Sequence, residues 1–518
     1  MATLKKNRTR IVVLAVLALL FFSAIQGMEE PQDWVITILR GLSVGMVTFL
    51  VASGLSLIFG LMDVLNLAHG EMFMLGAYMG WTVFVRPDTF VDVLAPLFLV
   101  VAGFALTPVW RVLLARLKVS EQMKQVWPAA ALLIALVILF FTFTKFPITG
   151  WNLGVFAEAP GTYALALDQG RLELPEPELV STGAAAAAIL GTLIGSSLLA
   201  LSLVGFAQKN QAGLLNPRLN KGPIVAAALL IVAGLVVYFA NDSLTTTLLD
   251  MGTTARFFLA MAVATIIGFV IGGIFESVLI RPLYDRPIYQ LMLTLGVSFI
   301  VIEVVRSIWG RPEFIMPKAE LFTGTGDFCP ATNLGDLLTY NCSTILLFDG
   351  RIRTYNEVFI ILVGLVVLLV VWLLLQRTRI GMIIRAGVQD SEMVEALGIN
   401  VRQVFTFVFA MGVALASLGG VLAAPSVGLS NGMGTQYLLL ALIALAIGGL
   451  TSFPGAAAGA ILVGLIQQFI IKYGQIGINL PFLEEPFKPS PPLVPASVVL
   501  LMVIILLVLP QGLFGRNE

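Results

Sequence analysis

The stretch of sequence that decides the fold is Gly60-Leu-Met-Asp63-Val-Leu-Asn66-Leu-Ala-His69-Gly70-Glu71-Met-Phe-Met-Leu-Gly76-Ala-Tyr78. Its polar and ionisable residues separate two apolar runs, near residues 34–60 and 67–84, which are long enough to cross a bilayer. Burying such groups at membrane depth costs free energy unless they pair with one another or face water. The candidate residues for a translocation pathway or its gate are therefore Asp63, Asn66, His69 and Glu71.

Two interpretations of this stretch remain open. In the first, it is a broken or re-entrant element that lines the pathway, and His69 donates a hydrogen bond to Glu71 or accepts one from Asn66. In the second, it is a short cytoplasmic turn between two helices, in which Asn66 and Glu71 cap the helices and His69 is interfacial. Spacing alone does not choose between the two.

Apolar runs of similar length recur along the whole chain, which predicts an all-α fold: a polytopic transmembrane helical bundle with about 12–14 membrane segments. Runs 11–25 and 436–449 are short, so either could be re-entrant or interfacial instead of spanning. The candidate segments lie near residues 11–25, 34–60, 67–84, 92–109, 129–148, 181–206, 222–240, 255–280, 289–308, 357–376, 401–424, 436–449, 456–474 and 493–509.

Composition supports a membrane protein and excludes several other classes. Of the 518 residues, 58% are hydrophobic and 12% are charged, and the mean hydropathy is +0.97, far from the composition of soluble domains. The 30 basic residues balance the 30 acidic ones, so nothing indicates a nucleic-acid partner. One histidine and two cysteines argue against the usual metal sites.

Catalytic motifs are weak in this chain. Ser43 and Ser430 stand in Gly-x-Ser-x-Gly patterns, but neither follows a hydrolase-like strand. Small residues spaced four apart more often allow close packing of membrane helices. No P-loop pattern is present in the sequence, so any ATP hydrolysis would take place in another subunit. We therefore expect a non-catalytic chain without a cofactor.

The distribution of Lys and Arg predicts the orientation. Basic loops alternate with acidic ones, among them an external loop with Asp88 and Asp92, and this places both termini in the cytoplasm and the long segment 309–356 outside. Cys329 and Cys342 lie in that segment, and their pairing would contribute about 3 kcal/mol by closing the loop between them. The alternative, two free thiols in a cytoplasmic loop, requires every basic loop to be reversed. Segment 11–25, with basic residues before it, is predicted to be a retained signal anchor instead of a cleaved signal peptide.

Residues 377–402 form a second informative stretch. Met393, Leu397 and Val401 recur every fourth residue, as in a short amphipathic helix on the cytoplasmic side. Such a helix could be a solvated connector. Its mixture of basic, acidic and apolar positions equally suits docking into a groove of a partner protein.

Both stretches resemble the permeases of branched-chain amino acid ABC importers. Residues 381–401 resemble the family's coupling segment, in which Glu392 and Gly398 keep the spacing of the importer "EAA…G" loop. Met393 and Val394 replace its two alanines, so the docking face could be repacked. The other motifs that carry the resemblance are Asn66-Leu-Ala-His69-Gly70-Glu71 with Gly76-Ala-Tyr78, Glu276 with Arg281-Pro282-Leu283, Gly448-Gly449-Leu450 with Pro454-Gly455, and Pro510-Gln-Gly512-Leu-Phe514-Gly515.

The resemblance covers about residues 34–85 and 255–515 and implies a domain organisation. Residues 1–33 would form a signal-anchor helix, 34–85 and 255–518 the permease core, and 86–254 an inserted four-helix membrane region with an acidic external loop. We expect that region to be a peripheral layer whose spans carry almost no ionisable residues. The residues that the resemblance implies for contact with an ATPase are Arg385, Asp390, Glu392, Glu395, Leu397 and Gly398.

The resemblance also implies a function and partners. The chain would pair with a homologous second permease in a bacterial plasma (inner) membrane, receive substrate from an external substrate-binding protein, and work with two ABC ATPase subunits. Branched-chain amino acids are the expected cargo, with urea, short amides or aromatic and other carboxylic acids as alternatives. A rival class is an ion-coupled secondary transporter that uses Asp63 and Glu71 and needs no partner.

Overall fold

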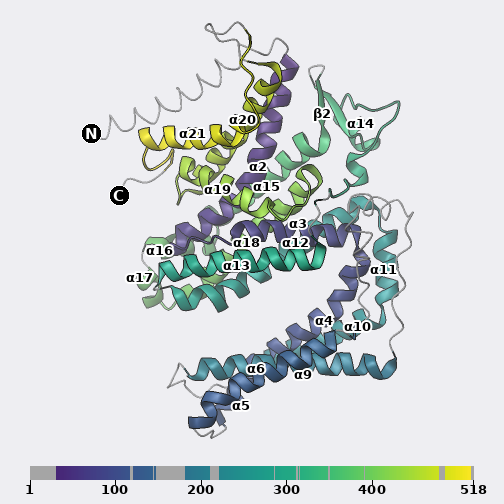
Figure 1. Ribbon diagram of the computed structural model, residues 1–518, viewed down its shortest axis with the longest axis vertical. Coiled ribbons are helices and arrows are strands. Elements are labelled where there is room, and N and C mark those ends of the chain that lie inside the picture. The colour runs from purple at the N-terminus through teal and green to yellow at the C-terminus, as the bar shows by residue number, and fades with distance from the viewer. Residues whose placement is uncertain are drawn as a thin grey trace. The chain divides into compact units, whose positions relative to one another are not determined.

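The structure is a computed structural model that describes residues 31–514 except 117–120, 144, 147–180, 210–220, 285, 311–312, 314, 348–349, 390 and 478–484. The described residues form two compact units. One comprises those up to Phe84 and from Thr253 onward, and the other comprises those from Val85 to Gly252. Figure 1 labels their helices and strands.

In the part of the first unit that the structure describes, the regular elements are helices and one hairpin. Its elements are α2 (Pro31–Met62), α3 (His69–Val85), α12 (Thr253–Phe275), the π-helix η1 (Glu276–Ile280), the 3₁₀ helix η2 (Arg281–Leu283), α13 (Pro287–Trp309), η3 (Glu320–Phe322), α14 (Leu334–Thr339), β1 (Thr344–Leu347), β2 (Gly350–Arg353), the π-helix η4 (Thr354–Phe359), α15 (Ile360–Arg377), α16 (Arg379–Gln389), α17 (Ser391–Ala396), α18 (Val401–Val427), α19 (Met433–Gly448), α20 (Phe453–Ile476) and α21 (Leu493–Val508).

The second unit is all helical in its described residues. Its elements are α4 (Pro87–Ala105), α5 (Thr107–Arg116), α6 (Glu121–Phe143), α9 (Thr182–Lys209), α10 (Gly222–Phe239) and α11 (Asn241–Asp250). Four stretches of this unit are long and apolar enough to span a membrane: Pro87–Ala115, Val126–Phe143, Thr182–Phe206 and Gly222–Phe239.

The prediction of a polytopic helical membrane protein is confirmed. Every predicted apolar segment within the described residues overlaps a helix, and ten helices in that part of the chain are long and apolar enough to cross a membrane. The helices α3, α19 and α21 are shorter, and α3 and α19 each begin after a break in the chain. Segment 11–25 lies outside the described residues.

One prediction for the second unit is wrong. Asp88 and Asp92 were expected in an external loop, but both residues lie buried within α4. Each carboxylate has a polar partner nearby. Arg86 Nη2 lies 2.7 Å from Asp88 Oδ2, and Asn241 Nδ2 donates to Asp92 Oδ1 at 2.7 Å. Buried carboxylates are tolerated when they are paired in this way, and apolar run length alone does not reveal the pairing.

Small residues pack the helices of the first unit closely, as the sequence predicted. A Cβ at Gly41 would lie 2.8 Å from Leu465 Cδ2, and one at Gly45 would lie 2.9 Å from Ile461 Cα, so α2 and α20 meet almost backbone to backbone.

The second Gly-x-Ser-x-Gly pattern has a different role. Gly428, with a φ of 87°, ends α18, and the pattern spans the break before α19.

The segment between α13 and η4 is held together by strands and a disulfide. Cys329 and Cys342 are bonded, with Cα atoms 5.5 Å apart. β1 and β2 pair antiparallel, with Ile345 opposite Ile352. Cys342 is fully buried and forms a bridge with Gly324, so the disulfide lies at the centre of this small folded segment.

Candidate functional site

The candidate site lies where α2 ends at Met62 and α3 begins at His69. Asp63 adopts a φ of 52°, an uncommon conformation for a residue other than glycine, and its amide bonds the Phe59 carbonyl at 2.9 Å. The side chain of Asn66 then accepts a hydrogen bond from the Ala68 amide at 3.1 Å. These local bonds end one helix and start the next, so the predicted break exists.

The four candidate residues separate into two groups. Asp63 is exposed, whereas Asn66, His69 and Glu71 are at most 1% exposed. Each of the three buried side chains keeps one atom without a hydrogen-bond partner within the described part of the chain: Asn66 Nδ2, His69 Nδ1 and Glu71 Oε2. Buried polar atoms are nearly always satisfied in folded proteins, so three such atoms within six residues mark this turn as a functional candidate.

His69 faces α2. Its Nε2 atom lies 3.2 Å from the Val51 carbonyl oxygen, and a Cβ at Gly54 would lie 2.8 Å from the same nitrogen. The glycine therefore makes room for the ring. The expected hydrogen bond of His69 to Glu71 or Asn66 is wrong, because the ring is held against α2 while Glu71 is held by other helices.

Glu71 faces α13 and α19. Its Oε1 atom accepts hydrogen bonds from Ser298 at 3.1 Å and from Thr435 at 3.1 Å. Sequence reasoning missed both partners. They lie 227 and 364 residues away in the chain, and no local pattern points to either.

The first turns of α3 and α19 meet at this site. A Cβ at Gly70 would collide with the Gly434 carbonyl oxygen. A Cβ at Gly434 would in turn lie 2.8 Å from the Gly70 oxygen and would collide with Glu71 Oε2. α19 itself follows the break at residues 428–432. Further along α3, the Tyr78 hydroxyl donates to Asn431 Oδ1, in the break before α19, at 3.4 Å. Two helices that both follow a break thus enclose a buried carboxyl group, an arrangement that transporters use at their binding sites.

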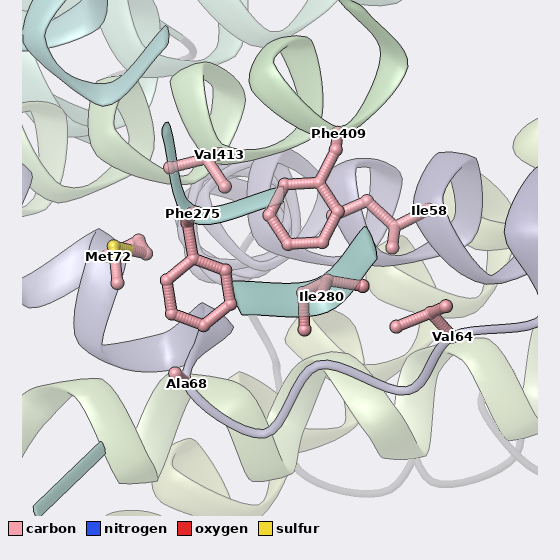
Figure 2. Packing of buried hydrophobic residues seen from close by; sticks show 8 residues of the cluster. All are labelled: Ile58, Val64, Ala68, Met72, Phe275, Ile280, Phe409 and Val413. Carbon is pink, nitrogen blue, oxygen red and sulfur yellow. The ribbon is translucent and has the colours of Figure 1, made fainter. Parts of the chain in front are cut away.

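An apolar cluster lies beside the break and connects it to α12, η1 and α18. Phe275 and Phe409 stack with ring centres 5.7 Å apart, and Figure 2 shows the side chains gathered around them. We call this group the break cluster; its buried members are Ile58, Val64, Ala68, Met72, Phe275, Ile280, Phe409 and Val413.

The predicted ATPase-contact residues lie on and after α16 and α17. Met382, Met393 and Leu397 are 62%, 62% and 72% exposed, whereas Val394 is buried and anchors α17. Arg385 is exposed and Glu395 is exposed. Asp390 and the side chain of Glu392 lie outside the described residues.

Gly398 has a clear structural role. Its φ is 83°, its amide bonds the Glu395 carbonyl at 2.9 Å, and the Ile399 amide bonds the Val394 carbonyl at 3.3 Å. This is the Schellman arrangement that ends helices, and the left-handed conformation favours glycine. The glycine of the coupling motif therefore terminates α17 at the exposed Leu397.

The fold and these sites define a multi-pass helical membrane protein whose core contains broken helices around buried polar groups. The family model described as "Branched-chain amino acid transport system / permease component" matches residues 37–168 and 170–509. The chain belongs to this family. The matched ranges include nearly all of residues 86–254, so the resemblance extends over the region that the sequence motifs did not cover.

Individual relatives support the same family. The high-affinity branched-chain amino acid transport system permease protein BraD of Pseudomonas aeruginosa is 30% identical over 173 residues, which are 33% of this chain and 51% of BraD. The LivH protein of the same description from Escherichia coli (strain K12) is 26% identical over 257 residues, 49% of this chain and 73% of LivH. The chain thus spans about half the length of BraD.

A relative named for another cargo matches more briefly. The galactose/methyl galactoside import permease protein MglC of Haemophilus influenzae is 28% identical over 155 residues, which are 29% of this chain and 46% of MglC. No solved structure matches this chain.

Proposed function

We propose that this protein is the permease subunit of an ABC importer that moves branched-chain or related hydrophobic amino acids into the cytoplasm. The observation that carries the proposal is the buried Asn66, His69 and Glu71 cluster at the helix break, in a chain of the branched-chain amino acid permease family. Substrate would arrive from an external binding protein, two ATPase subunits would hydrolyse ATP, and a homologous permease would complete the channel. One relative, MglC, is named for import of a sugar. The comparisons therefore support the class of importer more strongly than they support the identity of the transported substrate.

Within this function, the turn between α2 and α3 would line or close the translocation route. A route through a membrane protein needs polar groups at membrane depth that exchange partners as substrate passes. Each of the three buried side chains holds one atom in a hydrogen bond and leaves another without a partner. Asp63, which is exposed at the start of the break, would lie at the mouth of this route.

The rival proposal, an ion-coupled secondary transporter, has less support. It would use Asp63 and Glu71 together, but Asp63 is exposed and Glu71 is buried. Glu71 is held by two hydroxyl groups from α13 and α19. The rival also offers no role for the exposed apolar side chains on α16 and α17.

Orientation can be tested with single cysteines. The proposed topology puts Ile315, which is 64% exposed, outside the cell and Met393 in the cytoplasm. We expect a membrane-impermeant maleimide added to intact cells to label Ile315→Cys and to leave Met393→Cys unlabelled until the cells are permeabilised. Labelling of Met393→Cys in intact cells would show that the orientation is reversed.

The coupling surface, defined here as Ile380, Met382, Met393 and Leu397, is proposed to bind an ATPase subunit. Apolar side chains exposed on an otherwise charged segment typically mark a protein contact. We expect Leu397→Asp to lower the amount of ATPase subunit that co-purifies with the permease by about tenfold, the scale of a buried anchor residue. Leu397 is a cleaner probe than Gly398, because any side chain at Gly398 strains the turn.

The matched control for that experiment is Leu338→Asp. Leu338 is 68% exposed and lies on α14, on the side of the membrane proposed to be external. It should leave co-purification unchanged. Equal loss in both variants would point to general misfolding, and no loss in either would remove the assignment of the coupling surface.

Residues 86–254 are proposed to form a peripheral layer outside the translocation route. In the second unit, only 17% of the Val126–Phe143 span and 17% of the Gly222–Phe239 span are buried, as expected of helices that contact lipid or another membrane protein. Its buried carboxylates, Asp88 and Asp92, have partners within the unit, Arg86 and Asn241 respectively. The arrangement supports a structural role for these residues.

A further inference from the structure

We propose that the π-helix Glu276–Ile280 carries movement between the coupling surface and the break between α2 and α3. The inference rests on the proposed function, because it assumes that ATPase subunits act on α16 and α17. It assigns a positioning role to Glu276 and Arg281, which bind neither substrate nor nucleotide.

The backbone of this segment is irregular where a helix would otherwise continue. α12 passes at Phe275 directly into the π-helix η1, which is followed by the 3₁₀ helix η2. π-helical turns are rare and occur frequently at functional sites, because they loosen the regular hydrogen-bond ladder. A change in the position of α18 can therefore be taken up here without unfolding α12.

A partly buried ion pair connects this segment to α18. Glu276 is fully buried, and Arg281 donates to its carboxylate through Nε at 3.2 Å and through Nη2 at 2.8 Å. The Tyr284 hydroxyl also donates to Glu276. Nη2 of Arg281 further donates to Thr406 Oγ1 at 2.6 Å. We call Glu276, Arg281, Tyr284 and Thr406 the clamp.

One residue of the clamp, Thr406, lies close in sequence to the coupling surface. α17 ends at Ala396, Gly398 forms the turn, and Asn400 caps α18 by accepting from the Gln403 amide at 3.3 Å. Thr406 lies in the second turn of α18. A displacement of α17 would therefore reach Thr406 through a short, capped connection.

Two residues next to the clamp in the sequence also contact the break between α2 and α3. Phe275 precedes η1 and Ile280 ends it, and both belong to the break cluster with Val64 and Ala68. Figure 2 shows Phe275 and Ile280 beside the chain that runs from Val64 to Ala68. Tightly packed interiors transmit displacement because they contain few voids. The order of contacts is thus α17, α18, the clamp, the break cluster and the break.

The test compares substrate uptake with ATP hydrolysis in the complete importer, reconstituted in proteoliposomes with its ATPase subunits and binding protein and supplied with leucine. Glu276→Gln keeps the shape of the side chain but removes the charge that holds Arg281, which in turn binds Thr406. We expect uptake per ATP hydrolysed to fall about fivefold, within the range found for coupling changes. Arg281→Lys keeps the charge but cannot bridge both partners, and should give an intermediate ratio.

Two further variants keep the result interpretable. Glu303→Gln alters an exposed pair on α13, with Arg306 Nη1 at 2.6 Å, and should leave the ratio unchanged. Thr406→Val removes the bond from Arg281 to α18 and the local bond from Thr406 to the Arg402 carbonyl, but leaves the pair of Glu276 with Arg281 intact. It serves if Glu276→Gln does not assemble, and its ratio should also fall. An unchanged ratio in an assembled Glu276→Gln or Thr406→Val complex overturns the inference. Failure of the unaltered permease to retain ATPase subunits would overturn the proposed function instead.

Discussion

Replacing Glu71 with glutamine is expected to reduce substrate uptake by the reconstituted importer at least about tenfold, equivalent to roughly 1.4 kcal/mol. The glutamine side chain can still accept hydrogen bonds from Ser298 and Thr435, as Glu71 Oε1 does at 3.1 Å in each case. It replaces the unpartnered Oε2 with an amide group that can only donate. The change therefore removes the pathway role proposed for Glu71 and retains its packing role.

Two companion variants sharpen this test. Thr435→Val removes one structural hydrogen bond and leaves both carboxyl oxygens, so uptake should remain close to normal. His69→Ala empties the space beside Gly54 and should reduce uptake as Glu71→Gln does. Assembly with the other subunits must be checked for each variant. Near-normal uptake in both Glu71→Gln and His69→Ala would defeat the pathway proposal and leave a helix cap whose loss costs roughly 1 kcal/mol.

Replacing Gly70 with alanine is expected to destabilise the permease core by about 3 kcal/mol, the upper range for overpacking. The new methyl group would collide with the Gly434 carbonyl oxygen and lie 2.7 Å from Leu438 Cβ. Because backbone atoms stand in the way, no change of side-chain rotamer relieves the collision. The first turns of α3 and α19 would have to separate. The thermal unfolding midpoint of the purified protein in detergent measures the effect.

The control for this variant is Gly296→Ala on α13. A Cβ at Gly296 meets nothing within 4 Å, and alanine favours helix more than glycine does. The unfolding midpoint of Gly296→Ala should therefore stay the same or rise. A Gly70→Ala midpoint equal to that of the unaltered protein would show that the contact between α3 and α19 is looser than described.

The helices of this protein could be predicted from its sequence because length and apolarity are local properties. The break between α2 and α3 was predictable for the same reason, since Asn66, His69 and Glu71 interrupt the apolar pattern visibly. The partners of these residues were not predictable. Ser298 and Thr435 stand in ordinary apolar helices, and only the fold brings them to Glu71.

Other parts of the site depend on contacts that no sequence pattern reports. The break before α19 was interpreted as a packing motif, because Gly428 and Gly432 are spaced as in close helix pairs. The link from Arg281 to Thr406 joins residues 125 positions apart. Asp88 and Asp92 were placed in a loop because their compensating partners, Arg86 and Asn241, are not recognisable as partners before the chain folds.

The disulfide has a practical consequence for spectroscopy and labelling. The sequence contains only two cysteines, and both are consumed by the bond between Cys329 and Cys342. The natural protein therefore presents no free thiol to a reagent, provided that reducing agents are left out of the purification. Any cysteine introduced for a spin label, a fluorophore or a cross-linker would be the sole reactive site, and no cysteine-free background has to be engineered first.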